Sequence, residues 1–143
     1  MPVARRIAVL VALAALILAG VARPSAAAEA TDIAMCSGDS TPEAAIEACG
    51  RLIASGRFAG AELAKVLFWR GYARDRQDAK DAALADYSEA IRLDPTTAAA
   101  YEGRARILTE TGHRDRAIAD WSEIVRLDPN YLTGHVNRVP CAS

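Results

Sequence analysis

The side chains of this sequence that most readily do chemistry are three cysteines and two histidines. Cys36 and Cys49 are thirteen positions apart, and Cys141 stands near the end of the chain. A zinc site needs four thiolate or imidazole ligands, commonly in closely spaced pairs, and neither Cys141 nor His135 has such a partner. The spacing therefore predicts no metal site. It allows one disulfide, and the odd number of cysteines then leaves one thiol over.

The residues needed for catalysis are equally scarce. His113 follows Gly112 in a predicted turn, and neither histidine has a nucleophilic Ser or Cys and a positioned carboxylate beside it in the sequence. The sequence contains no glycine-rich phosphate loop and no paired metal motif. We therefore predict that the chain is not an enzyme and needs no cofactor or small-molecule substrate. A small enzyme is the least favoured alternative.

Residues 1–28 have the composition of a secretory signal. Arg5 and Arg6 precede an apolar run at residues 7–22, and Ala26 to Ala28 supply the small residues that a signal peptidase reads. The alternative is a retained membrane anchor, but a spanning helix needs about 20 apolar residues. We predict cleavage after Ala28 and export, with the bacterial periplasm as the expected compartment. An oxidising compartment of this kind favours a disulfide.

The charge balance excludes one class of partner. The chain carries a formal net charge of −1, and its acidic and basic residues are interspersed as on a solvated helix surface. A nucleic-acid-binding domain usually presents a basic face, so no nucleic-acid partner is expected. The sequence after residue 28 is long enough for one domain with a modest core.

An internal repeat determines the predicted fold. The segment DAALADYSEAIRLDP at residues 81–95 recurs as DRAIADWSEIVRLDP at residues 115–129, with an offset of 34 and ten of fifteen positions identical. Pro95 and Pro129 forbid continuation of a helix, and Gly112 suits a left-handed helix end. The chain is therefore predicted to be all-α. The apolar periodicity places helices at residues 64–75, 79–93, 98–111 and 114–127.

These residues resemble the tetratricopeptide repeat (TPR) family. The family pattern puts Leu-Gly and Tyr in a first helix, then Ala-x-x-x-Phe and Pro in a second. The first copy supplies Gly71, Ala83, Tyr87 and Pro95, and the second supplies Tyr101, Ala105, Leu108, Ala117, Trp121 and Pro129. The sequence departs from the pattern at Leu67, Arg70, Arg74 and Arg104. The resemblance implies a short superhelix of antiparallel helix pairs, with about two and a half repeats over residues 42–139.

The repeat pattern also predicts how the two ends are closed. Residues 43–56 resemble the second helix of an incomplete repeat, capped by Thr41, with Cys49 in the slot that Tyr87 and Trp121 fill to pack against the next helix. A small residue there leaves room for residues 29–41 to fold back, so we predict a Cys36–Cys49 disulfide and a free Cys141. At the other end, residues 131–139 resemble a capping helix, followed by a tail at residues 140–143.

Arginine and aspartate positions suggest an ion pair within the repeats. In a bacterial subset of the family that this sequence resembles, Arg beside the small residue of the first helix accompanies Asp in the second, here Asp86 and Asp120. We expect Arg70 or Arg104 to pair with Asp86. Two solvated charges are the alternative, and exposed pairs contribute only about 0–1 kcal/mol.

The family resemblance finally implies a function. First helices of TPR domains line a concave groove that receives segments of partner proteins, so we predict a non-catalytic scaffold of the cell envelope. Phe68 and Tyr72 form a candidate binding hot spot, and the alternative is that Phe68 belongs to the core. Self-association into a homo-oligomer is the alternative function. The residues predicted to face the groove are Lys65, Phe68, Tyr72, Asp75, Arg76, Glu102, Arg106, Thr109 and Glu110.

Overall fold

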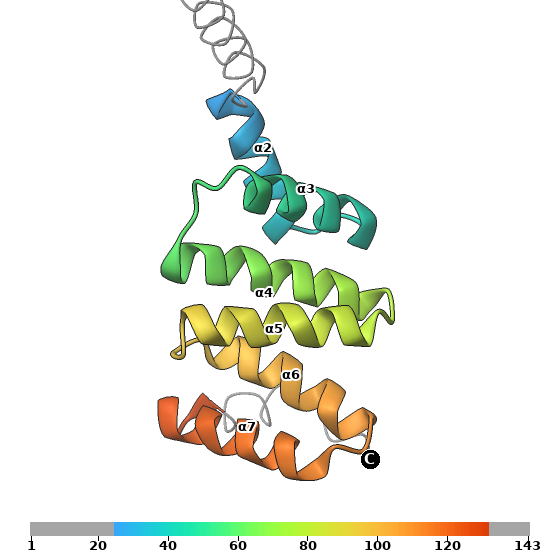
Figure 1. Cartoon of the computed structure of the whole chain (residues 1–143), viewed down its shortest axis with the longest axis vertical. Helices are drawn as coiled ribbons and strands as arrows, with labels where there is room; N and C mark the ends of the chain where they lie inside the picture. Colours follow the sequence, from blue (N-terminus) through green and yellow to red (C-terminus); the bar gives the residue numbers. More distant parts are fainter. Residues whose placement is uncertain (1–24, 132–143) are drawn as a thin grey trace, which may run out of the picture.

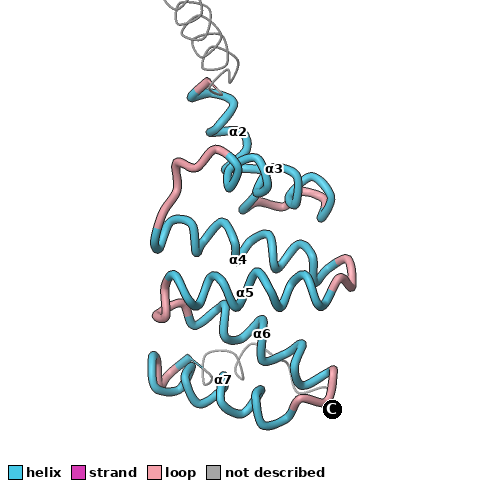
Figure 2. Tube along the Cα trace, viewed as in Figure 1, coloured by secondary structure: helices cyan, strands magenta, loops and turns pink. Residues whose placement is uncertain are grey.

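The computed structural model describes residues 25–131, and within that range the chain forms six helices and no strand. The last four of these helices pair into two antiparallel hairpins, and the first two form an N-terminal hairpin whose helices cross at a steep angle (Figure 1). The three units stack along the long axis of the molecule. Figure 2 shows that only short loops join them. The predicted all-α TPR-like architecture is confirmed. The helices span Ala26–Ser37 (α2), Pro42–Ala54 (α3), Gly60–Arg76 (α4), Lys80–Leu93 (α5), Ala98–Glu110 (α6) and Arg114–Leu127 (α7).

Local sequence signals explain where several helices begin and end. The Thr41 hydroxyl accepts a hydrogen bond from the Ala44 amide at 3.3 Å and so caps α3, as predicted. Gly112 follows α6 with φ +81°, a left-handed conformation that glycine adopts without strain. The same position in the preceding repeat holds Asp78 with φ +60°. Aspartate is one of the few other residues that adopt this conformation, so both repeats turn in the same way.

The N-terminal hairpin is more complete than the sequence predicted. Residues 29–41 were expected only as a tethered segment, whereas α2 is a helix that packs against α3 and α4. The Sγ atoms of Cys36 and Cys49 lie 2.12 Å apart, at disulfide distance, which is the predicted pairing. The first turn of α2 contains Ala26 to Ala28, so the predicted cleavage after Ala28 would shorten this helix. Cys141 lies outside the described residues.

One tyrosine organises the centre of the molecule. Tyr87 of α5 is fully buried, and its ring lies between α4 and α6. A Cβ atom added at Gly71 would come within 3.1 Å of this ring, and one added at Gly103 within 2.5 Å. Both glycines therefore provide the space that the tyrosine occupies. Phe68 packs against the same cluster, with its ring centroid 6.0 Å from that of Tyr87.

The residue equivalent to Tyr87 in the next repeat has a different environment. Trp121 of α7 was expected to fill a gap to a following helix, but within residues 25–131 it is only half-buried. It shares its face of α7 with Ile118 and Val125, which are 62% and 43% exposed. The capping helix predicted at residues 131–139 falls almost wholly outside the described residues. Packing of the cap on Trp121 therefore stays a prediction.

Candidate functional site

Buried ion pairs fix each first helix against its second helix. Asp86 of α5 is 3% exposed and accepts two hydrogen bonds from Arg70, at 2.9 and 2.7 Å, and one from Arg74 at 2.8 Å. The predicted Arg70–Asp86 pair is thus present. The alternative partner was wrong, because Arg104 of α6 binds Asp120 of its own hairpin at 2.8 and 2.6 Å. Two-pronged arginine–carboxylate contacts of this kind fix orientation as well as distance.

The two first helices, α4 and α6, are also joined to each other across the repeat boundary. Asp75 of α4 forms an ion pair with Arg106 of α6. Beside it, Tyr72 is 41% exposed, and the guanidinium of Arg76 stacks over its ring at 6.0 Å from the centroid. The structure therefore brings together four of the predicted groove residues. We call Tyr72, Asp75, Arg76 and Arg106 the first-helix surface.

Aromatic and polar contacts extend this surface towards the N-terminal hairpin. The Trp69 ring meets the edge of Tyr72 with centroids 6.1 Å apart, and Trp69 in turn contacts Phe68 at 5.1 Å. The Arg76 guanidinium donates a long hydrogen bond of 3.5 Å to the Ser40 carbonyl oxygen in the loop between α2 and α3. The three hairpins therefore all contribute to one side of α4.

A buried hydroxyl lies close to the first-helix surface. Among the described residues the Tyr87 hydroxyl has no hydrogen-bond partner, although the residue is fully buried. Burial raises the pKa of Tyr87 well above its usual range, the Asp75 carboxylate raises it further, and the Arg106 guanidinium opposes the shift. These two charges therefore act on the tyrosine that supports the surface.

The remaining predicted groove residues have other surroundings. Phe68 is half-buried against the core, which favours its structural role. Glu102 accepts a hydrogen bond from the Tyr131 hydroxyl at 2.7 Å, and Glu110 pairs with Lys80 at the start of α5. Thr109 is exposed, and its hydroxyl donates to the Ala105 carbonyl oxygen of its own helix at 2.8 Å. Lys65 does not contact the four residues of the first-helix surface and lies instead at the rim of a cavity beside Trp69.

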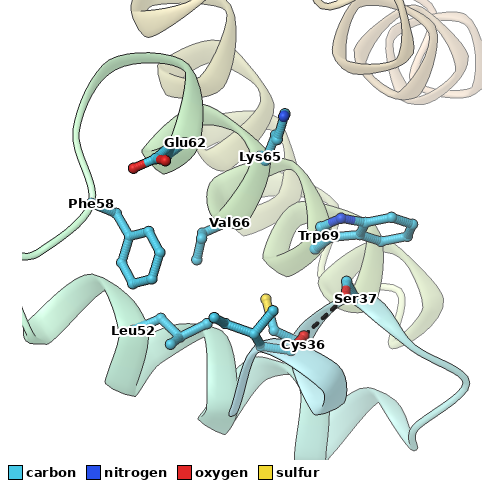
Figure 3. Close-up of a pocket in the computed structure, with 9 residues that line it drawn as sticks. Cys36, Ser37, Leu52, Phe58, Glu62, Lys65, Val66 and Trp69 are labelled. Atoms are coloured by element: carbon cyan, nitrogen blue, oxygen red, sulfur yellow. Dashed lines mark hydrogen bonds between the residues drawn. The ribbon is translucent and has the colours of Figure 1, made fainter. Parts of the chain in front are cut away.

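That cavity was not predicted from the sequence. It lies between α4 and the N-terminal hairpin and has a volume of about 300 Å³ (Figure 3). Three of its lining residues, Ile33, Cys36 and Ser37, belong to α2, a helix that the repeat pattern does not describe. Val66 and Trp69, three positions apart on α4, were the available signal, since they form a second apolar stripe beside Leu67 and Gly71. The apolar lining comes from Ile33, Cys36, Leu52, Phe58, Val66 and Trp69.

Residues 25–131 contain neither a metal-ligand cluster nor a membrane-spanning helix. In this part of the chain, no three His, Cys, Asp or Glu side chains gather as ligands for a metal ion. None of its helices combines the length and the apolar character needed to cross a membrane. The site is therefore characterised by the aromatic, charged and apolar surfaces described above.

Comparison with known proteins agrees with this geometry. The family model for the tetratricopeptide repeat matches residues 64–97, which contain most of α4 and all of α5, so the resemblance seen in the sequence is confirmed there. Comparison with curated proteins gives no match. The crystal structure of MamA aligns with a TM-score of 0.58 and 23% sequence identity, covering 66% of this chain and 53% of MamA. The chain thus matches about half the length of MamA, and this similarity concerns the fold.

Proposed function

Because this chain carries a tetratricopeptide repeat and folds as a stack of such hairpins, we propose that it is a non-catalytic scaffold that binds a segment of a partner protein. The binding site in this proposal is the first-helix surface on α4 and α6. TPR domains are protein-interaction modules in general, and in this proposal Tyr72, Asp75, Arg76 and Arg106 take that role. The partner is a protein of the cell envelope.

One observation carries the proposal: an exposed tyrosine stands beside an ion pair that joins two first helices. Tyr72 offers a large, rigid apolar surface with a polar tip, which is the residue type most often found at the centre of protein interfaces. Asp75 offers a hydrogen-bond acceptor and Arg106 a donor, which at present bind each other. A partner segment can replace this ion pair by bonds to its own polar groups. The buried pairs at Asp86 and Asp120 hold this arrangement rigid, which lowers the ordering cost of binding.

The structure also shows how this site is best tested. Replacing Arg106 alone by an acidic residue would place two carboxylates together, since Asp75 is its partner. A loss of binding could then reflect a disturbed fold. The double exchange Asp75→Arg with Arg106→Asp keeps an ion pair but inverts its direction. Combined with Tyr72→Ala, it removes the apolar anchor and the charge pattern while leaving both helices paired. The matched control is Val125→Ala on α7, because Val125 is 43% exposed and Tyr72 is 41% exposed.

Binding is measured by crosslinking and mass spectrometry in extract from the native compartment. We expect the parent and the Val125→Ala protein to recover the same partners and the triple variant to lose them, with circular dichroism and melting unchanged. Recovery of the same partners at equal yield by the triple variant would show that the first-helix surface is not the binding site.

Export belongs to the same proposal. The signal features of residues 1–28 support it, and the Cys36–Cys49 pair at bonding distance is typical of proteins in an oxidising compartment. Sequencing of the mature protein should give an N-terminus at Glu29 or within a few positions of it. A membrane-bound product that still begins with Met1 would contradict export by cleavage.

Self-association is the second candidate function, favoured by the apolar face of α7. Ile118, Trp121 and Val125 line a shallow depression there, and two of these residues are largely exposed. Such exposed apolar groups often mark contact surfaces. If this face joins two copies, light scattering of the purified protein should give a dimer or larger assembly, and Ile118→Glu should convert it to a monomer. A monomeric parent would exclude this candidate.

A further inference from the structure

The cavity at the N-terminal hairpin has the form of a small apolar binding pocket. Figure 3 shows Phe58 and Trp69 at its two ends, with Val66 of α4 above and Leu52 of α3 and Cys36 of α2 below. Ile33 completes the lining from α2 and is 43% exposed. Ser37 of α2 also lines the pocket, but its hydroxyl donates to the Ile33 carbonyl oxygen. The other groups named are apolar, so the pocket favours an apolar occupant.

The size of the pocket limits what that occupant can be. Its volume of about 300 Å³ is at the lower end of the range for ligand pockets, which is roughly 300–1,000 Å³. A cavity of about 150 Å³ is already large enough to bind benzene. The pocket therefore has room for one large aliphatic or aromatic side chain.

The rim of the pocket carries two charges at different positions along α4. Glu62 lies in the first turn, on the side of Phe58, and Lys65 lies one turn before Trp69 (Figure 3). Among the described residues, Lys65 has no ion pair within 4 Å, whereas Arg70 and Arg74 of the same helix are bound to Asp86. Hydrogen bonds from Thr96 lower the pKa of Asp94, which follows α5, and the ammonium group of Lys65 lowers it further from beyond ion-pair distance. This ammonium group still leaves positions for a carboxylate from outside, at the end of the pocket nearer Trp69.

The pocket is continuous with the first-helix surface. Trp69 forms one end of the pocket, and its ring meets the edge of Tyr72, with centroids 6.1 Å apart. A chain that crosses Tyr72 therefore reaches the pocket by passing over Trp69. This continuity favours a protein segment as the occupant, since a separate small molecule would not need the neighbouring surface.

We propose that the pocket receives a leucine- or phenylalanine-sized side chain of the partner segment, and that an acidic residue beside it pairs with Lys65. The inference rests on the proposed function. It adds that the partner segment carries an apolar residue next to an acidic one. Glu62 disfavours an acid at the Phe58 end, so the two charges also set the direction of the segment. The Cys36–Cys49 link ties α2 to α3 and thereby keeps the pocket in shape.

The test uses Trp69 as its own reporter and does not require the natural partner. In a Trp121→Phe background Trp69 is the only tryptophan of the protein. Its fluorescence is followed while three synthetic octapeptides with glycine and serine flanks are added. One contains Phe-Asp, one Phe-Lys and one Gly-Asp at its centre.

We expect the Phe-Asp peptide to change the emission of Trp69 saturably and the Gly-Asp peptide to have no effect. The Phe-Lys peptide should bind about two- to fivefold more weakly, because a rim-exposed ion pair contributes at most about 1 kcal/mol. Lys65→Gln should abolish that difference. If Phe-Asp and Gly-Asp peptides behave alike, or if Lys65→Gln leaves the preference for Asp unchanged, the proposal is wrong.

Matched variants locate the binding. Ile33→Glu puts a charge at the mouth of the pocket, and Ala85→Glu introduces the same charge at an exposed site on α5. Phe-Asp binding should fall about tenfold or more in the first and stay unchanged in the second, since a charge next to a buried apolar group is strongly unfavourable. An equal loss in both variants would contradict the assignment to this pocket, as would a response to dodecanoate in place of the peptide.

The experiment separates this inference from the proposed function. If the Phe-Asp peptide fails to bind while the triple variant at Tyr72, Asp75 and Arg106 still loses its partners, the pocket inference fails and the scaffold proposal stands. If the peptide binds at the pocket and the triple variant keeps its partners, the site of the proposed function is wrong and the pocket remains.

Discussion

Two successive interfaces of the stack, one between α5 and α6 and one between α3 and α4, are filled in opposite ways. In the first, the second helix supplies the large Tyr87 and the first helix of the next hairpin supplies Gly103. In the second interface, the slot that corresponds to Tyr87 holds the small Cys49. The position that corresponds to Gly103, 34 residues earlier, holds the large Trp69, which packs against the buried cluster around Cys49. In both interfaces a large residue meets a small one. The large residue comes from the second helix α5 in the first interface and from the first helix α4 in the second.

This exchange has structural consequences. Tyr87 fills its interface completely, since it is fully buried between two glycines. The small Cys49 lets α2 approach closely enough for the link to Cys36, and a cavity lies beside Trp69 between α2, α3 and α4. The tight interface therefore supports the fold, whereas the open one offers a binding pocket.

The largest expected effect comes from removing the tyrosine of the tight interface. Tyr87→Ala should lower the free energy of unfolding by about 3–5 kcal/mol, because a buried aromatic ring is lost and the two glycines cannot fill the void. Trp121→Ala at the equivalent position should lower it by only about 1–2 kcal/mol, because this indole is half-exposed. Urea unfolding followed by circular dichroism gives both values. Equal losses would mean that a further segment covers α7 and buries Trp121.

Breaking the covalent link of the open interface should have the next largest effect. The double change Cys36→Ser with Cys49→Ser should lower the free energy of unfolding by up to about 3 kcal/mol, the value of the chain-entropy model for a loop of this size. It should also weaken binding of the Phe-Asp peptide, because α2 is no longer held against α3. Alkylation of the parent without reduction should label one thiol per chain, at Cys141. Three labelled thiols would show that the pair is reduced.

Glycine replacements measure how closely the tight interface is packed. Gly103→Ala should lower the free energy of unfolding by about 1–2 kcal/mol, because its Cβ would come within 2.5 Å of a ring that has no room to move. Gly71→Ala should be closer to neutral, since its contacts of 3.1–3.2 Å need a smaller shift and the gain in helix propensity offsets it. If both replacements stabilised the protein, the ring would not be confined as described.

The smallest effect is expected at the turns of the two repeats. Asp78→Gly should raise the free energy of unfolding by a few tenths to about 1 kcal/mol, because glycine adopts φ of +60° more readily than aspartate does. Gly112→Ala, at the equivalent turn, should lower it by about 1 kcal/mol. Thermal unfolding resolves the two directions. A loss of stability in Asp78→Gly would mean that the exposed contact with Lys80 outweighs this preference.

The sequence predicted what depends on local pattern and on the repeat period. The offset of 34 located the helices of both repeats, and the small Cys49 in an aromatic slot indicated the link to Cys36. The same period also indicates the correct partner of Arg104, because Arg70 and Asp86 are sixteen positions apart, as are Arg104 and Asp120. The expected contact of Arg104 with Asp86 crossed a repeat boundary for which no sequence signal existed.

The remaining features depend on contacts between residues distant in sequence. The ion pair of Asp75 with Arg106 joins two helices whose relative rotation the sequence does not specify. Gly103 has a role only because the Tyr87 ring reaches it from another helix. The cavity beside Trp69 likewise requires the position of α2, for which the repeat supplies no counterpart. The predicted groove therefore stays a prediction, and the structure adds contacts among its residues that the sequence did not indicate.

Site-specific photocrosslinking tests the central claim most directly. The photoreactive residue p-benzoylphenylalanine is placed at Tyr72 on α4 in one protein, and at Ala85, an exposed residue of the second helix α5, in another. Both proteins are irradiated in the native compartment, and adducts are identified by mass spectrometry. Binding at the first-helix surface predicts a defined partner adduct from position 72 and none from position 85. The same adduct at equal yield from both positions, or from position 85 alone, would contradict it.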